Sequence, residues 1–180
     1  MDDSLALLIS DNELKQKVEE MGRKINHFYA GQDVDELVII GILRGSFIFM
    51  ADLVRQLSLP LELDFMDVSS YGKSSVTTGM VRILKDISED ITNKHVLLVE
   101  DIVDSGLTLK YLSKILWSRS PRSLRICTLL NKPSRRQVEL EPDFCGFLVP
   151  DEFIVGYGLD FAGKYRELPY LAILKQKEQP

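Results

Sequence analysis

The first thirty residues carry apolar side chains at the spacing of an amphipathic helix. Steps of four and three residues separate the apolar positions after Ser10, which are Leu14, Val18, Met21, Ile25 and Phe28. Ser10 and Glu13 have the spacing of a capping box, and Gly31 is suited to end a helix. We therefore predict a helix from about Ser10 to Gly31.

Three apolar runs have the composition of strands that are buried on both faces. They cover residues 37–43, 96–99 and 123–130. Helical spacing follows the first run over residues 47–57 and resumes after the second run, until Pro121 ends it. Strands that alternate with helices indicate an α/β fold, with a mostly parallel twisted sheet that helices flank.

The remaining patterns are shorter and more polar. Residues 61–65 alternate apolar and acidic side chains, which predicts a strand with one wet face, and residues 80–84 are predicted to return beside it. The polar stretch 69–79 between them is predicted to be a loop. Late strands or a small subdomain are predicted over residues 147–149, 153–158 and 171–174.

The composition indicates one domain over residues 1–180, because 180 residues with 45% apolar types can build one core. The net charge of −5 argues against broad binding to nucleic acid or to an anionic membrane. The sequence shows neither a basic secretory start nor an apolar run near the ~20 residues of a membrane span. Cys127 and Cys145 lie in apolar runs and are predicted to be buried free thiols. We expect a cytoplasmic protein.

Ligands of open α/β sheets bind beyond the carboxyl ends of the strands, and the turn after the second buried strand carries the most chemistry. It places three carboxylates before a small-residue turn, in the order Glu100, Asp101, Asp104, Ser105, Gly106, Leu107 and Thr108. Small residues and hydroxyls at a helix start form a phosphate cradle. Since carboxylates repel a bare phosphate unless they face hydroxyls or a hard cation, the combination suggests a phosphorylated sugar. In the structural alternative, the acidic pair only ends a strand and Asp104 caps the helix.

Two glycine-containing segments fail the motifs that they partly match. Gly72-Lys73-Ser74 ends like a nucleotide-binding P-loop, but Asp67 stands where that loop needs its first glycine. Gly156-Tyr157-Gly158 starts like a dinucleotide fingerprint, but Phe161 occupies the third glycine position. ATPase and dehydrogenase functions therefore lose their main support.

The segment from Val96 to Thr108 resembles the phosphoribosyl pyrophosphate-binding motif of the type I phosphoribosyltransferases. It has the apolar residues, the acidic pair and the glycine-containing phosphate loop of that motif. The rest of the chain resembles the hypoxanthine-guanine phosphoribosyltransferases, from Ile40-Gly41-Ile42-Leu43-Arg44-Gly45 to Asp160 and Arg166. The resemblance implies a single phosphoribosyltransferase domain, to which the N-terminal segment and residues 150–180 contribute a small hood.

The resemblance implies purine salvage: the phosphoribosyl group passes from phosphoribosyl pyrophosphate to a 6-oxopurine, pyrophosphate leaves, and Mg²⁺ is required. In the family pattern, Glu100 and Asp101 bind the ribose hydroxyls directly or through Mg²⁺, and Asp160 helps hold the metal. Asp104 is the expected catalytic residue, placed to take the proton from purine N7. The 5′-phosphate is expected to bind the turn formed by Ser105, Gly106, Leu107 and Thr108.

The resemblance also assigns residues around the leaving group. Leu43, Arg44 and Gly45 match the family's pyrophosphate loop, in which a non-proline cis peptide precedes the basic residue. Arg166 is the second cation expected to contact pyrophosphate, and Ser70 with Tyr71 begins the expected lid. Taken alone, Arg44 is also typical of a solvated charge at a strand end, and for Arg166 a surface charge is the favoured interpretation. The lid segment, taken alone, is also typical of an ordinary loop.

The base is expected to contact Lys132, Phe153 and Ile154. Lys132 ends a predicted strand and can donate to the 6-oxo oxygen of a purine, whereas an amino group there would offer it no acceptor. This disfavours adenine. In the family pattern Phe153 stacks on the purine and backbone groups near Ile154 read its far edge, although an aromatic beside apolar residues is more often part of a core.

Two departures from the family pattern and four open questions accompany the resemblance. Leu107 stands where some members carry a polar or basic residue, and small residues follow Asp160 where polar ones are common. The second candidate function is a phosphoribosyltransferase-like regulator that binds RNA, against which the isoelectric point near 5.1 argues. A transferase for another base, such as xanthine, uracil or adenine, is the third. The order of preference among hypoxanthine, guanine and xanthine stays open, and the implied assembly is a homodimer or homotetramer.

Overall fold

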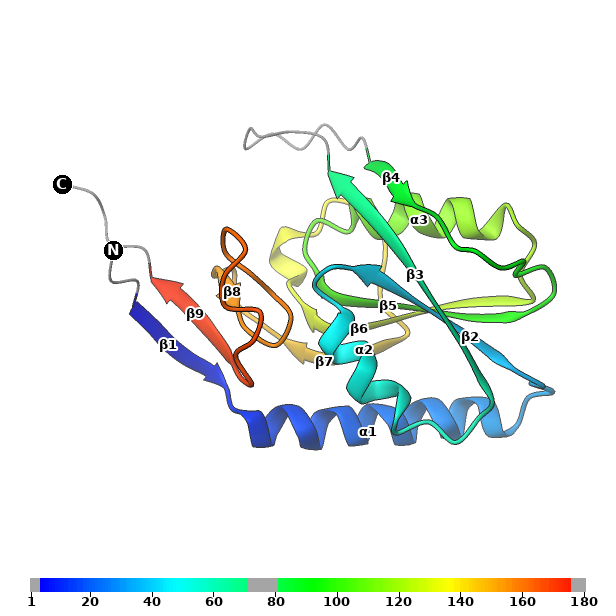
Figure 1. The fold of residues 1–180 in the computed structure, drawn as a ribbon, viewed down its shortest axis with the longest axis horizontal. Helices are drawn as coiled ribbons and strands as arrows, with labels where there is room; N and C mark the ends of the chain where they lie inside the picture. Colours follow the sequence, from blue (N-terminus) through cyan, green and yellow to red (C-terminus); the bar gives the residue numbers. More distant parts are fainter. Residues whose placement is uncertain (1–3, 71–80, 176–180) are drawn as a thin grey trace.

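The structure, a computed structural model, describes residues 4–70 and 81–175. Its elements are β1 (Ser4–Ile9), α1 (Asp11–Ala30), β2 (Leu37–Leu43), α2 (Phe47–Val54), β3 (Leu61–Ser70), β4 (Val81–Lys85), β5 (His95–Val103), α3 (Leu107–Trp117), β6 (Ser123–Asn131), the 3-10 turn Pro133–Arg135, β7 (Phe144–Leu148), β8 (Ile154–Val155) and β9 (Leu171–Lys175). Within the described ranges they form a six-stranded sheet and a three-stranded sheet, which Figure 1 shows side by side.

The six-stranded sheet has the order β4-β3-β2-β5-β6-β7, and its pairs are parallel except for β3 with β4. The predicted fold class, a mostly parallel sheet flanked by helices, is confirmed. Because β2, β5 and β6 are parallel neighbours in the middle of the sheet, their carboxyl ends meet at one edge. Each of these three strands leads directly into a segment that carries predicted site residues.

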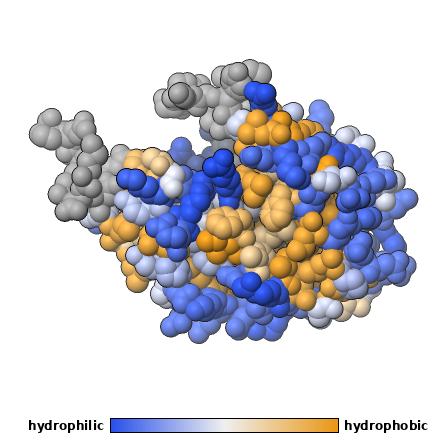
Figure 2. Space-filling view, in the orientation of Figure 1, coloured by the Kyte–Doolittle hydropathy of each residue, from blue (hydrophilic) through white to orange (hydrophobic). Residues whose placement is uncertain are grey.

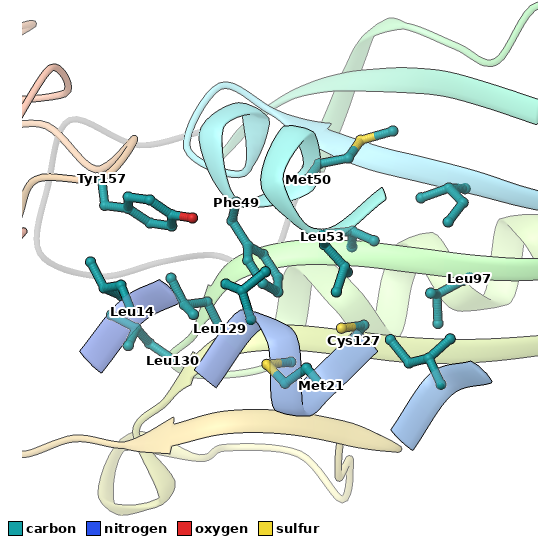
Figure 3. Close-up of a cluster of buried hydrophobic side chains, with 14 of the residues drawn as sticks. Leu14, Met21, Phe49, Met50, Leu53, Leu97, Cys127, Leu129, Leu130 and Tyr157 are labelled. Atoms are coloured by element: carbon teal, nitrogen blue, oxygen red, sulfur yellow. The ribbon is translucent and has the colours of Figure 1, made fainter. Parts of the chain in front are cut away.

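Helices cover the sheet on both faces. Side chains of α1 and α2 pack with β2, β5 and β6 in one apolar cluster, and α3 packs against the other face. Figure 3 shows the first cluster, where Phe49 and Leu53 of α2 lie among Met21, Leu97 and Leu129. Fully burying a side chain of this size contributes about 1.5–3 kcal/mol, so the cluster holds the strand ends in fixed positions.

The three-stranded antiparallel sheet, in the order β1-β9-β8, belongs to a region that we call the hood: β1, β9 and residues 149–170. Ile154 and Leu171 of the hood join the apolar cluster of α1 and α2. The Tyr157 hydroxyl donates to Asp52 of α2 at 2.5 Å, and Figure 3 shows its ring directed toward Phe49. Burial and this carboxylate hold the pKa of Tyr157 above its usual range, so the phenol stays a donor. The hood is thus fastened to the main sheet through α2.

Three predicted strands have different bounds in the structure. The strand predicted over 96–99 extends from His95 to Val103, because residues beyond the acidic pair still pair with β6. The strand predicted over 61–65 continues to Ser70, because β4 pairs with its second half. Of residues 153–158 only Ile154–Val155 forms a strand, since the next three residues all have positive φ and turn the chain.

Other predictions need smaller corrections. The helix predicted over 47–57 ends at Val54, where i to i+3 backbone bonds tighten the last turn. The late strand predicted over 147–149 is β7, and β1 was not predicted as a strand.

Cys127 is buried but Cys145 is only partly buried, and both are free thiols. Among the described helices, none has the length and apolar character needed to cross a membrane.

Candidate active site

Most of the predicted site residues line one cavity of about 620 Å³ at the carboxyl ends of β2, β5 and β6. From the predicted set, its walls include Leu43, Arg44, Gly45, Glu100, Asp101, Asp104, Ser105, Gly106, Thr108, Lys132, Phe153, Ile154, Asp160 and Arg166. Leu107 begins α3 and is not among the lining residues. Of the predicted lid, Ser70 ends β3, and Tyr71 lies outside the described residues.

Glu100 and Asp101 lie on β5, and each is only 9% exposed. Asp101 accepts a hydrogen bond from the Ile102 backbone at 2.6 Å, and Glu100 accepts one from the Asp101 backbone at 3.2 Å. Burial, together with the neighbouring Asp101 carboxylate, raises the pKa of Glu100 well above its usual range. Burial also raises the pKa of Asp101, and Arg166 partly opposes that rise. Neither carboxylate forms an ion pair within the described part of the chain, so the pair is suited to a cation or to hydroxyl groups.

Gly45 is the reason that the acidic pair fits beside the loop after β2. A Cβ atom on Gly45 would lie 1.4 Å from the Asp101 Oδ2 atom, which no side chain tolerates. On its other side, a Cβ on Gly158 of the hood would lie 2.1 Å from the Gly45 carbonyl oxygen. The peptide between Leu43 and Arg44 is cis, as the resemblance implied, and the Arg44 side chain is exposed. Gly45 therefore makes room for the Asp101 side chain, and Gly158 lets the backbone of the hood approach the backbone of Gly45.

The turn between β5 and α3 is open toward the cavity. Gly106 is the N-cap of α3 with φ 79°, a left-handed conformation that suits glycine. Among the described residues no side chain caps this helix, and the Ser105 hydroxyl accepts only a long 3.4 Å bond from the Leu107 backbone. The alternative in which Asp104 caps the helix is therefore wrong. The positive end of the helix and its free N–H groups make the turn suitable for an anion.

Asp104 pairs instead with Arg135, a residue that the sequence did not single out. The Arg135 Nε atom lies 3.0 Å from Asp104 Oδ1, and its Nη1 atom donates to Asp151 at 3.2 Å. All three side chains line the cavity. The sequence shows Arg135 as one of two adjacent arginines shortly after Lys132, and no spacing rule ties it to either carboxylate.

Lys132 occupies the other wall of the cavity, one residue after β6. Its side chain is 6% exposed, and its ammonium group donates to the Glu152 carbonyl at 2.7 Å. An ammonium group has three N–H donors, so Lys132 can still donate to a ligand. Phe153 is 48% exposed and packs edge-to-face on Phe161, whereas Ile154 is buried in β8. A half-exposed ring beside a buried cation is suited to a flat polar ligand.

Asp160 and Arg166 pair with each other at 2.6 Å. Asp160 also accepts from the Gly163 backbone, and Arg166 donates to the Gly158 carbonyl at 2.6 Å. Within the described ranges, no three His, Cys, Asp or Glu side chains lie close enough together to hold a metal ion. The protein would therefore supply only some of the oxygen ligands of a cation, as is usual for Mg²⁺ that is shared with substrate phosphates.

Three comparisons identify relatives of the chain. Residues 9–162 match the phosphoribosyl transferase domain family. The hypoxanthine phosphoribosyltransferase of Haemophilus influenzae is 53% identical over 92% of this chain and 92% of its own length, and that of Escherichia coli K12 is 52% identical over 95% and 96%. A solved hypoxanthine-guanine phosphoribosyltransferase of Bacillus anthracis has a TM-score of 0.89 and 47% identity, over 96% of this chain and 99% of that one.

We expect Gly45→Ala to destabilise the protein, because the added methyl group displaces the buried Asp101 carboxylate. Overpacking of this kind costs roughly 1–3 kcal/mol. Urea unfolding should show that loss, and Gly31→Ala is the matched control, since Gly31 has open space around its Cβ position and a negative φ. Equal stabilities of the two variants would contradict the close packing of Gly45.

We expect Glu100→Gln to stabilise the protein at pH 7.5 and to have little effect at pH 4.5. The folded state raises the pKa of Glu100, so the penalty for ionising it is absent below the unfolded pKa, grows as the pH rises from the unfolded toward the folded pKa, and is constant above the folded pKa. Removing the charge should then gain roughly 1–3 kcal/mol at pH 7.5. Urea unfolding at both pH values measures this gain, with exposed Glu139→Gln as control. If Glu100→Gln were less stable than the wild type at pH 7.5, the buried Glu100 charge would not be destabilising and the prediction would be wrong.

Proposed function

This chain belongs to the phosphoribosyltransferase family, and from that premise we propose which of its residues perform each part of the reaction. The chain is an enzyme of purine salvage, which transfers the phosphoribosyl group of phosphoribosyl pyrophosphate to a purine base and releases pyrophosphate. The hypothesis of an RNA-binding regulator is not favoured, since the curated relatives are named as hypoxanthine phosphoribosyltransferases. We propose hypoxanthine and guanine, both 6-oxopurines, as its bases.

One observation carries the assignment of residues: an open helix N-terminus, a buried acidic pair and a buried lysine face a single cavity. These are the groups that a phosphate, a ribose and a 6-oxopurine require. In this proposal the turn of Ser105, Gly106, Leu107 and Thr108 holds the 5′-phosphate with backbone N–H groups and hydroxyls. Leu107 contributes its backbone only.

The leaving group needs positive charge and N–H donors. As pyrophosphate departs, positive charge develops at the anomeric carbon and negative charge on the leaving oxygen. Arg44, exposed on the loop with Leu43 and Gly45, and Arg166, on the hood, are proposed to bind pyrophosphate from two sides. Arg166 would then exchange its pairing with Asp160 for one with the phosphates. Ser70 and Tyr71 are proposed to begin a lid that excludes water from this step.

The acidic pair fits Mg²⁺, since two buried carboxylates have no cationic partner among the described side chains. Glu100 and Asp101 would hold the ion together with the ribose hydroxyls. Asp160 does not cluster with them among the described residues, so it is proposed to help hold the metal only once Arg166 has exchanged its pairing with Asp160 for the phosphates. When bound, Mg²⁺ neutralises charge on the pyrophosphate and so makes it a better leaving group. The two carboxylates themselves orient the ribose by accepting from its hydroxyls.

Asp104 is proposed as the proton acceptor. As the bond between the anomeric carbon and the purine forms, the purine must lose the proton on N7, and a carboxylate at the cavity wall can accept it. Lys132 donates to the 6-oxo oxygen, Phe153 stacks on the ring and the backbone near Ile154 reads the far edge. A buried ammonium group repels an exocyclic amino donor, which is why adenine is a poor base in this proposal.

We also propose a homodimer or homotetramer. Leu63 on β3 and Leu84 on the neighbouring β4 are 49% and 54% exposed, and Figure 2 shows apolar surface gathered along these strands. Contiguous apolar surface of this kind is typical of an interface.

A cytoplasmic location is inferred from the two free cysteines, because unpaired thiols are typical of a reducing compartment.

An absorbance assay tests the proposal directly. The enzyme is given phosphoribosyl pyrophosphate, Mg²⁺ and one base at a time: hypoxanthine, guanine, xanthine, adenine or uracil. We expect turnover with hypoxanthine and guanine and none in excess chelator. Faster turnover of adenine or uracil would overturn the base assignment, and full activity in chelator would overturn the metal assignment.

Lys132→Ala should raise the KM for the 6-oxopurine while leaving the KM for phosphoribosyl pyrophosphate nearly unchanged. The lost bond is charge-assisted, so the cost is about 1.5–3 kcal/mol, or roughly a tenfold to hundredfold rise in KM. Steady-state kinetics with each substrate varied in turn measure both constants. Lys110→Ala, which removes an exposed lysine of α3, is the control. Unchanged purine kinetics would place Lys132 outside the base site.

Asp104→Asn should keep the stability of the protein and lower kcat by roughly 10²–10⁴-fold, the usual contribution of a positioned general base. The smaller loss is expected, because a water molecule can take the proton while the rest of the site still promotes departure of pyrophosphate. Asp35→Asn, an exposed carboxylate between α1 and β2, is the control. A fully active Asp104→Asn enzyme would show that a group other than Asp104 accepts the proton.

A further inference from the structure

Arg135 joins two walls of the cavity that come from distant parts of the chain. Its Nε atom lies 3.0 Å from Asp104, in the turn after β5, and its Nη1 atom lies 3.2 Å from Asp151, in the hood. Asp151 stands two residues before Phe153, the proposed stacking residue. A guanidinium group is planar and rigid, so contacts at two of its nitrogens fix its position better than either contact alone.

The backbone holds Arg135 close to Asp104 independently of this ion pair. The Lys132 N–H donates to the Val103 carbonyl at 2.9 Å, and the Gln137 N–H donates to the Ser105 carbonyl at 3.0 Å. These two bonds attach the segment 132–137 to the end of β5 and to the turn that follows it, on each side of Asp104. Arg135 lies between the two attachment points, and its own N–H donates to the Lys132 carbonyl.

The neighbouring Arg136 shows that charge alone does not bring an arginine to Asp104. Arg136 donates to the Asn131 side chain, and its guanidinium lies against Gly106, 3.0 Å from the position of a Cβ atom there. It makes no ion pair with a carboxylate in the described part of the chain. Of two adjacent arginines, the 3-10 turn directs only the first to the carboxylates at the cavity.

We propose that Arg135 is a positioning residue for the transfer reaction: anchored by Asp151, it holds the Asp104 carboxylate in the orientation that accepts the purine proton. The proposal rests on the proposed role of Asp104. In the reaction the bond from the anomeric carbon to pyrophosphate breaks, the bond to the purine forms, and the purine proton passes to a carboxylate oxygen of Asp104. Arg135 neither gains nor loses a proton.

Arg135 is expected to act on Asp104 through geometry. Its Nε atom makes one ion-pair contact with the carboxylate, at the buried Oδ1 atom, and its Nη1 bond to Asp151 holds the guanidinium group from the other side. A carboxylate held in one orientation accepts a proton faster than one that must reorient. We therefore expect kcat to fall when Arg135 is removed.

The test compares Arg135→Met, Arg135→Lys and the control Arg119→Met in steady-state assays with hypoxanthine and phosphoribosyl pyrophosphate. Arg119 pairs with Asp86 away from the cavity, so its variant makes the same change of charge without touching the site. We expect Arg135→Met to lower kcat roughly tenfold to a hundredfold, with both KM values changed by less than about threefold. Arg135→Lys should recover part of kcat, because an ammonium group can reach one carboxylate but cannot bridge two. Melting temperatures should match the wild type, since exposed ion pairs contribute little to stability.

A second variant tests the anchor. Asp151→Asn should lower kcat several-fold in the wild-type background, and it should have no further effect when combined with Arg135→Met. Additive losses would show that the two residues act separately and would overturn the proposal. So would a rise in kcat for Arg135→Met, or a change confined to the KM of the purine, which is expected of a residue that merely contacts the base.

The outcomes also separate this proposal from the proposed function. If the wild-type enzyme does not convert hypoxanthine, the proposed function fails, and the role of Arg135 fails with it. If the wild type turns over and Asp104→Asn is inactive, but Arg135→Met keeps the wild-type kcat, only the proposal for Arg135 is refuted.

Discussion

The burial of two adjacent carboxylates at the end of the central strand is the constraint on which the rest of the site depends. Glu100 and Asp101 are displaced from water by a fold that gives them no ion-pair partner among the described residues. Both carboxylates lose hydration when the chain folds, and this loss lowers the stability of the folded protein. The apolar clusters that cover both faces of β5 offset this loss of stability.

The second consequence of that burial is close packing around Gly45. Asp101 can lie inside the loop after β2 only because residue 45 has no side chain, and the Gly45 carbonyl in turn leaves space for nothing larger than a glycine at position 158. The acidic pair, the loop after β2 and the hood are therefore packed in series. Little space separates each from the next, so the position of the hood depends on that of β5 through Gly45.

The sequence predicts the parts of this structure that depend on local pattern. The order of buried strands, the long first helix and the small-residue turn before α3 all follow from spacing over a few residues, and the resemblance supplies the roles proposed for residues such as Lys132 and Arg166. The capping role for Asp104 is wrong because spacing alone does not show that Gly106, in a left-handed conformation, is the N-cap of α3. Arg135 was missed because its partners lie 31 residues before it and 16 residues after it, and only the folded chain brings them together. The turn after β8 was mistaken for strand, since Tyr157 takes a positive φ that its residue type does not suggest.

The pairing of β1 with β9 sets the order in which the enzyme can mature during synthesis. Residues 4–9 are made before every other described element, yet their hydrogen-bonding partner, residues 171–175, is made after every other described element. The main sheet and the turn between β5 and α3 can be in place while Phe153 and Arg166 still lack the strand that orders the hood around them. A nascent chain can therefore form the cavity wall at the ends of β2, β5 and β6 before the wall that the hood supplies, and the complete cavity requires the pairing of β1 with β9.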